Sequence, residues 1–258
     1  MKGFVEKWEK YWEEFSTPLS QRVYLELITK RIFEACETLL NLDEVSSYDR
    51  ECICIIDVGC GTGYLDILLS EKRNFHIVGV DISKNALNIA KKDVEDNNLK
   101  HKISFVKGDV FNLPSKDGAF DIAVSTGYGS AVTYLNGTEE VIRTVKKEGV
   151  IIFDFIRMPN LYQPLKSIRG YLNYRWEVQK VEEGGKWGDP GLKHYHFGKL
   201  GLKKRFEEVL ELKIIKSYML FTYPPVRNRK FCLMFENTLG KVLSPLLSRV
   251  LVLFFERK

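Results

Sequence analysis

Three closely spaced glycines form the strongest chemical pattern in the sequence, within the stretch IIDVGCGTGY. An apolar run at 52–58, typical of a buried strand, leads directly into Gly59, Gly61 and Gly63. Glycine allows backbone angles and close approaches to a ligand that a Cβ atom would block. A helix beginning at Tyr64 would offer free amide groups to an anionic part of that ligand. The pattern predicts a ligand-binding loop between a strand and a helix.

The spacing of these glycines differs from the fingerprint of dinucleotide-binding proteins. That fingerprint is Gly-x-Gly-x-x-Gly, and its third glycine brings helix and strand together around a pyrophosphate. Here the spacing is Gly-x-Gly-x-Gly, and Tyr64 stands in the sixth position. A nicotinamide-dependent dehydrogenase is therefore an alternative that the spacing disfavours.

Two acidic residues follow the next two predicted strands. Asp81 ends the run at 76–81 and lies 18 residues after Gly63 (81 − 63). A carboxylate near this offset accepts hydrogen bonds from ribose hydroxyls in α/β nucleoside sites. Asp109 follows the next strand, where a carboxylate can accept from an adenine amino group. Taken alone, Asp81 could simply begin a helix, and Asp109 could belong to a turn.

The elements that must position these residues alternate between strands and helices. Apolar runs predict strands at 52–58, 76–81, 103–107, 120–125, 150–155, 213–221 and 250–256. Helical periodicity predicts two helices within 1–50 and others at 64–71, 83–97, 138–147 and 200–210. This order predicts an α/β fold: a Rossmann-like, doubly wound, mostly parallel seven-stranded sheet with an antiparallel last strand.

One domain, 1–258, is expected, with an aromatic-rich insertion after the fifth strand. Its four parts are N-terminal helices at 1–50, a cofactor-binding core at 51–156, the insertion at 157–199, and the rest of the core at 200–258. The insertion contains Trp176 and Trp187. Ligands of open α/β sheets bind at the carboxyl ends of the strands, so we expect the insertion to cap an acceptor pocket. The alternative is a homodimer interface.

The glycine loop, Asp81 and Asp109, in this order on successive strands, resemble class I S-adenosylmethionine (SAM)-dependent methyltransferases. The resemblance is clear from residue 52 to 155, and VKKEGVI at 145–151 is similar to the family's turn into strand five. The resemblance implies SAM as cofactor. The residues that it implies around SAM are Asp57, Gly59, Gly61, Thr62, Gly63, Asp81, Ile82, Asp109, Val110 and Ser125.

The resemblance also implies a role for each of these residues. The three glycines and Thr62 line the methionine end and the ribose, and Asp57 supports the loop and the amino group. Asp81 takes the ribose hydroxyls, and the side chain after it packs on the adenine. Asp109 and the amide of Val110 read the adenine edge. Ser125 lies near the sulfur that carries the methyl group.

No catalytic residue is predicted, because the sulfonium donor is already activated and mainly requires positioning of the acceptor. His194 and His196 are either a general base or strand residues on one face. Two histidines without a third ligand do not predict a metal site. Tyr11 either reaches the cofactor from the N-terminal helix, as an aromatic does in several relatives, or packs in the core.

We expect methyl transfer from SAM to a small-molecule acceptor. An RNA or protein methyltransferase is a second hypothesis, based on basic runs at 203–205 and 227–230 that are more typical of solvated surfaces. A non-catalytic protein that binds SAM or S-adenosylhomocysteine (SAH) is a third, which the intact glycine loop disfavours.

Composition narrows the partners and the compartment. The net charge of +5 is weak evidence for nucleic acid, which is not favoured as a partner. No apolar run approaches the roughly 20 residues of a membrane span, so no membrane association is expected. The N-terminus does not resemble a secretory signal. Five cysteines without a Cys-x-x-Cys pair fit a reducing compartment, so a cytoplasmic protein is expected.

Overall fold

The computed structural model describes part of the chain, which divides into two compact units. The described residues are 2–14, 25–30, 32, 52–71, 75–126, 137–157, 196–197, 206–207, 210–220, 234 and 250–257. One unit comprises 1–152 with Arg257, and the other comprises 153–256 with Lys258. Trp176, Trp187, His194 and both basic runs lie outside the described residues.

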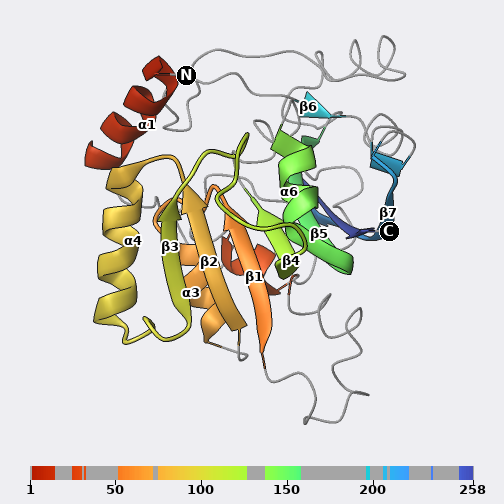
Figure 1. The fold of residues 1–258 in the computed structure, drawn as a ribbon, viewed down its shortest axis with the longest axis horizontal. Helices are drawn as coiled ribbons and strands as arrows, with labels where there is room; N and C mark the ends of the chain where they lie inside the picture. The colour runs from red at the N-terminus through yellow and green to blue at the C-terminus, as the bar shows by residue number, and fades with distance from the viewer. Residues whose placement is uncertain are drawn as a thin grey trace. The chain divides into compact units, whose positions relative to one another are not determined.

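The sheet of the first unit has the strand order β3-β2-β1-β4-β5 (Figure 1). In the centre lies β1 (Ile53–Val58), parallel to β2 (Phe75–Asp81) on one side and to β4 (Phe120–Ser125) on the other. The edge strand β3 (Ile103–Lys107) is parallel to β2. Parallel pairing brings the carboxyl ends of these strands, and the loops after them, to one edge of the sheet.

Helices cover both faces of this sheet. The helix α3 (Tyr64–Ser70) lies on the opposite face from α6 (Thr138–Thr144) (Figure 1). The helix α4 (Lys84–Asp96) contacts β2 and β3 through a buried stripe, and α1 (Lys2–Glu14) contacts α4. The stripe consists of Ala86, Leu87, Ala90 and Val94. The predicted doubly wound arrangement is confirmed.

The second unit contains the rest of β5 (Val145–Arg157), the two-residue strand β6 (His196–Phe197), β7 (Leu212–Leu220) and β8 (Val250–Arg257). The strand order is β5-β8-β7, and β6 is parallel to β5. Lys213, near the start of β7, forms an ion pair of 3.2 Å with Glu256, near the end of β8. The two strands are therefore antiparallel, as expected for the end of the sheet.

An aromatic cluster forms the core of the second unit. The rings of Phe153, Phe155, Phe206 and Phe255 are packed with centroid distances of 4.5–6.2 Å. All four side chains are fully buried. Among the described residues, no helix is both long enough and apolar enough to cross a membrane.

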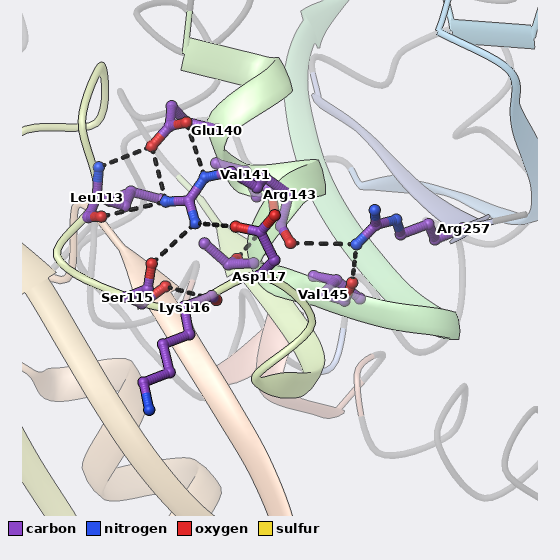
Figure 2. Close-up of polar contacts among 10 residues, drawn as sticks. Leu113, Ser115, Lys116, Asp117, Glu140, Val141, Arg143, Val145 and Arg257 are labelled. Carbon is purple, nitrogen blue, oxygen red and sulfur yellow. Dashed lines mark hydrogen bonds and ion pairs between the residues drawn. The ribbon is translucent and has the colours of Figure 1, made fainter.

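The predicted boundary between the helix at 138–147 and the strand at 150–155 is wrong. The helix ends at Thr144, and the strand begins at Val145 instead of residue 150. Lysine and glutamate are good helix formers, so the charged residues that follow extended the predicted helix. In the structure, the guanidinium of Arg257 donates to the carbonyl oxygens of Arg143 and Val145 (Figure 2). Arg257, which is distant in sequence, thus provides hydrogen-bond donors for carbonyl groups at the end of α6.

Candidate cofactor-binding site

The glycine loop lies at the carboxyl end of β1. Gly59, Gly61 and Gly63 have φ values of 81°, 55° and 68°, in the left-handed region that favours glycine. The amides of Gly59 and Cys60 donate to the carbonyl of Val80, at 2.7 and 3.2 Å. These bonds attach the loop to the end of β2. Gly59 is exposed at the edge of the sheet, whereas Thr62 is buried.

The aromatic ring of Phe105 explains why glycine is required at position 63 of the loop and at position 79 of β2. A Cβ atom at Gly63 would lie 2.5 Å from Cζ of Phe105, and one at Gly79 would lie 2.6 Å from Cδ1 of the same ring. No side chain fits at such distances unless the ring moves. Gly63, the third glycine of the loop, thus allows the loop to pack on the Phe105 side chain of β3. Sequence reasoning missed Phe105, because its apolar strand pattern carries no signal for this contact.

Asp81 connects the loop to the start of α4. Its Oδ2 accepts from the amide of Gly61 at 2.9 Å, and its Oδ1 accepts from the amide of Ser83 at 2.8 Å. Burial raises the pKa of Asp81, and the charge of Glu9 adds to this, while hydrogen bonds from backbone amides oppose it. An ionised carboxylate has about four acceptor positions, so Asp81 keeps capacity to accept from a ribose hydroxyl.

A second carboxylate, from α1, caps the same helix. Glu9 accepts from the hydroxyl of Ser83 at 2.8 Å and from the amides of Lys84 and Asn85 at 2.8 and 2.9 Å. Ser83 in turn accepts from the amide of Ala86, as N-cap side chains do. Glu9 thus attaches α1 to α4, which begins three residues after Asp81.

We expect Glu9→Gln to lower the free energy of unfolding by about 1–2 kcal/mol, the value of charge-assisted hydrogen bonds at a helix N-terminus. Burial alone would raise the pKa of Glu9. Hydrogen bonds from Asn85, Lys84 and Ser83, with the charge of Lys107, outweigh it and lower the pKa. This stabilisation is complete above the unfolded pKa and is lost as the pH falls through the folded value.

The measurement is urea unfolding of both proteins between pH 7 and pH 3. The two should differ at pH 7 and converge towards pH 3. Exposed Glu6, on the same helix, provides the control Glu6→Gln, which should leave stability unchanged. A difference between Glu9→Gln and the natural protein that persists unchanged at pH 3 would contradict the charged cap.

Aromatic residues of α1 cover the loop. A Cβ at Gly61 would lie 3.3 Å from Cζ2 of Trp12. Trp12 and Tyr11 are buried, with ring centroids 4.8 Å apart, and both pack with Ala86. The packing of Tyr11 agrees with the core contact that was the alternative to cofactor binding.

The turn after β3 holds Asp109 and Val110. The Oδ1 of Asp109 accepts from the amide of Phe111 at 3.1 Å, and its carbonyl accepts from the amide of Asn112 at 3.0 Å. These bonds correspond to the turn that was the alternative for Asp109 alone. They leave Oδ2 outside the turn's hydrogen bonds. A Cβ at Gly137 would lie 2.8 Å from Cγ2 of Val110, so the turn packs against the start of α6.

Arg143 of α6 fixes the chain that follows this turn (Figure 2). Its guanidinium donates to the carbonyls of Leu113 and Ser115, at 3.2 and 2.8 Å, and to the carboxylate of Asp117 at 2.6 Å. It also donates to both carboxylate oxygens of Glu140, and Oε2 of Glu140 accepts from the amide of Leu113 at 2.9 Å as well. Hydrogen bonds to Glu140 and Asp117 raise the pKa of Arg143, which stays charged. No sequence signal linked Arg143 to this segment.

The remaining predicted residues lie along the same edge. Ser125, at the end of β4, is buried, and its hydroxyl donates to the carbonyl of Val58 at 2.9 Å. This bond joins the carboxyl ends of β4 and β1. Ile82 is half-buried directly after Asp81, and Asp57 is buried within β1. The structure thus brings all ten predicted positions to one edge of the first unit's sheet.

The electrostatics of the loop suit a cationic ligand. Burial raises the pKa of the Cys60 thiol, and the nearby carboxyl groups of Asp66, Asp81 and Asp57 raise it further. The carboxyl groups of these three residues therefore lie near Cys60 of the loop. A pyrophosphate would be repelled here, whereas SAM carries a sulfonium and an ammonium group. Exposed Gly59 and the acceptor positions of Asp81 fit the rest of SAM. Among the described residues, no three His, Cys, Asp or Glu side chains are grouped as metal ligands.

Known proteins share this sequence pattern. A family model described as a methyltransferase domain matches residues 51–211. A demethylmenaquinone methyltransferase from Oceanobacillus iheyensis is 34% identical over 109 residues, covering 41% of this chain and 45% of that protein. A ribosomal protein L11 methyltransferase from Dictyoglomus turgidum is 26% identical over 197 residues, covering 70% of this chain and 64% of that protein. The matches span less than two thirds of these curated relatives.

Solved structures share the fold. A SAM-dependent methyltransferase from Methanosarcina mazei has a TM-score of 0.57 at 17% identity, covering 82% of this chain and 95% of that chain. The magnesium protoporphyrin IX methyltransferase of Synechocystis, solved with bound SAH, has a TM-score of 0.57 at 14% identity, covering 100% of this chain and 95% of that chain.

Proposed function

Because the chain belongs to the class I SAM-dependent methyltransferase family, we propose that it transfers the methyl group of SAM to a small-molecule acceptor by in-line displacement. The observation that carries the proposal is the glycine loop, whose Gly61 amide donates to Asp81 and whose Cys60 lies near the carboxyl groups of Asp57 and Asp66. Bound SAM supplies a methyl group already activated by the positive charge on sulfur. The protein then has to orient the acceptor and exclude water.

The chain's own residues support binding rather than acid–base chemistry. Gly59 and Gly61 allow close approach of the methionine end, and Asp81 has free acceptor positions for the ribose. Asp57 and Asp81 place negative charge near the loop, opposite in sign to a sulfonium. Asp109 and Val110 would meet the adenine edge. No proton transfer by a described residue is needed for displacement at a neutral acceptor atom.

The small-molecule acceptor is supported by the demethylmenaquinone methyltransferase relative, whose name states a quinone substrate. A protein acceptor is the second candidate, supported by the relative that acts on ribosomal protein L11, since that match covers more of this chain. The basic side chains at 203–205 and 227–230 would bind a polyanionic or ribosomal partner.

The test is transfer from SAM with a labelled methyl group into three separate fractions of a cell lysate: metabolites, RNA and protein. We expect label in the metabolite fraction, and much less of it with Asp81→Ala. Label only in protein or RNA would favour the second candidate. Calorimetric SAM binding without transfer to any fraction would favour a non-catalytic binding protein.

We propose that the segment 157–199 caps the acceptor. It follows the carboxyl end of β5, and the register of Ile156 with His196 returns the chain to that end. Once the acceptor is identified, it can be used as the substrate in the same assay. Trp176→Ala and Trp187→Ala should then raise the Michaelis constant for the acceptor and leave SAM affinity unchanged. A lower molecular mass by light scattering, together with a loss of activity, would instead favour a homodimer interface.

A further inference from the structure

A second buried carboxyl group faces Asp57. Asp66 lies in the first turn of α3 and is 0% exposed, and Asp57 in β1 is 2% exposed. Neither carboxylate oxygen of Asp66 has a hydrogen-bond donor among the described residues. The charged group that acts on Asp66 is Asp57 itself. The pair thus consists of two acceptors, and no cation of the described chain forms an ion pair with Asp66.

Two ionised carboxylates cannot share a dry site at low cost, because each desolvated charge is repelled by the other. One proton resolves the conflict. A protonated carboxyl has an O–H donor, which its ionised neighbour accepts. Both oxygens of Asp66 lack a donor, so the proton resides there. Burial raises the pKa of Asp66 well above its ordinary value, and the charge of Asp57 and the hydrogen bond to it raise it further.

We propose that Asp66 is a positioning residue for the cofactor: its protonated carboxyl donates a hydrogen bond to Asp57 and so fixes Asp57 beside the glycine loop. The other titratable groups at this place are Cys60 of the loop and Asp81 at the end of β2. With one proton, the pair carries a single negative charge, directed by Asp57 towards the loop. The inference rests on the proposed binding of SAM at this loop.

Asparagine tests the proton directly, because its amide donates a hydrogen bond as a neutral carboxyl does, whereas alanine does not. We expect Asp66→Asn to bind SAM within about twofold of the natural protein. Asp66→Ala should weaken SAM binding at least tenfold, the factor that corresponds to about one lost hydrogen bond to a charged group. Turnover at saturating SAM should change little in either variant. Ser70→Ala, at a buried polar residue of the same helix, is the control and should bind SAM normally.

A pH profile of thermal stability provides a readout that packing alone would not change. Asp66 has a higher pKa in the folded chain than in the unfolded chain. The folded state therefore binds more protons between the two values, and stability falls as the pH rises across that interval. Asp66→Asn cannot titrate, so its melting temperature should exceed that of the natural protein by several degrees at pH 8, roughly 3–5 °C per tenfold change in the folding equilibrium. The difference should shrink towards pH 4.

Loss of SAM affinity in Asp66→Asn equal to that in Asp66→Ala would overturn the proposal, since it would show that the ionised carboxylate is required. A stability difference between Asp66→Asn and the natural protein that does not depend on pH would overturn it too. Failure of the proposed function has a separate signature: the natural protein would not bind SAM at all, while the pH profile would still report the proton on Asp66.

Discussion

Gly63→Ala should lower the melting temperature by roughly 5–15 °C and remove measurable SAM binding. The added Cβ would lie 2.5 Å from the Phe105 ring and 3.2 Å from Cβ of Ala90, at a φ of 68°. A left-handed non-glycine residue costs about 1–3 kcal/mol, and overpacking a buried contact costs about 1–3 kcal/mol more. In a chain of this size, each kcal/mol corresponds to roughly 2–4 °C. Scanning calorimetry and SAM titration measure both effects.

Gly118→Ala separates the two causes. Gly118 has a φ of 58°, but a Cβ there would have only Cα of Lys146 nearby, at 3.8 Å. This variant shares the backbone strain and lacks the clash, so it should be clearly less destabilised and should bind SAM. Adding Phe105→Leu to Gly63→Ala should restore part of the stability by vacating the ring. Equal destabilisation of the two alanine variants would refute the role of Phe105.

Asp81→Ala should weaken SAM binding by roughly 10- to 150-fold, about 1.5–3 kcal/mol for hydrogen bonds to a charged acceptor. Two losses combine. The ribose loses its acceptor, and the amides of Gly61 and Ser83 lose the carboxylate that joins the loop to α4. The melting temperature should therefore fall as well, which the ribose contact alone would not predict. Calorimetric titration with SAM, alongside thermal unfolding, measures the two parts.

Asp81→Asn and Asp109→Ala are the matched controls. Asparagine keeps one acceptor oxygen, so its SAM affinity should lie between those of the natural protein and Asp81→Ala. Asp109→Ala should be milder, because in the proposed site the amide of Val110 and the packing on Ile82 would still serve the adenine. Unchanged SAM affinity in a folded Asp81→Ala protein would refute the assignment of the loop as the cofactor site.

Much of the first unit could be predicted from sequence because its signals are local. The strand pattern gave β3 and β4 with their observed bounds, and β1 within one residue at its start. Ser83 was recognisable as an N-cap because capping acts within three residues. The left-handed glycines followed from the spacing of the loop. These features depend on neighbours in sequence, which a pattern can reveal.

The missed features depend on contacts between distant residues. Glu9 caps α4 across 74–76 positions, and no local pattern pairs a helical glutamate with a remote helix end. Arg143 donates hydrogen bonds to the carbonyls of Leu113 and Ser115. Those carbonyls are within its reach only because of the turn that precedes them. Asp66 has an ordinary place in a first helical turn, and only burial against Asp57 makes it chemically distinctive.

The bonds from Arg257 to the carbonyls of Arg143 and Val145 close a loop of the chain, since the partners are 112–114 positions apart. The entropy of closing such a loop grows only with the logarithm of its length, so doubling the length costs about 0.6 kcal/mol. Segments between these ends can therefore lengthen or shorten over evolutionary time with little effect on the stability of the first unit. The proposed acceptor cap at 157–199 lies in that stretch, so it could diversify while the cofactor-binding half is retained.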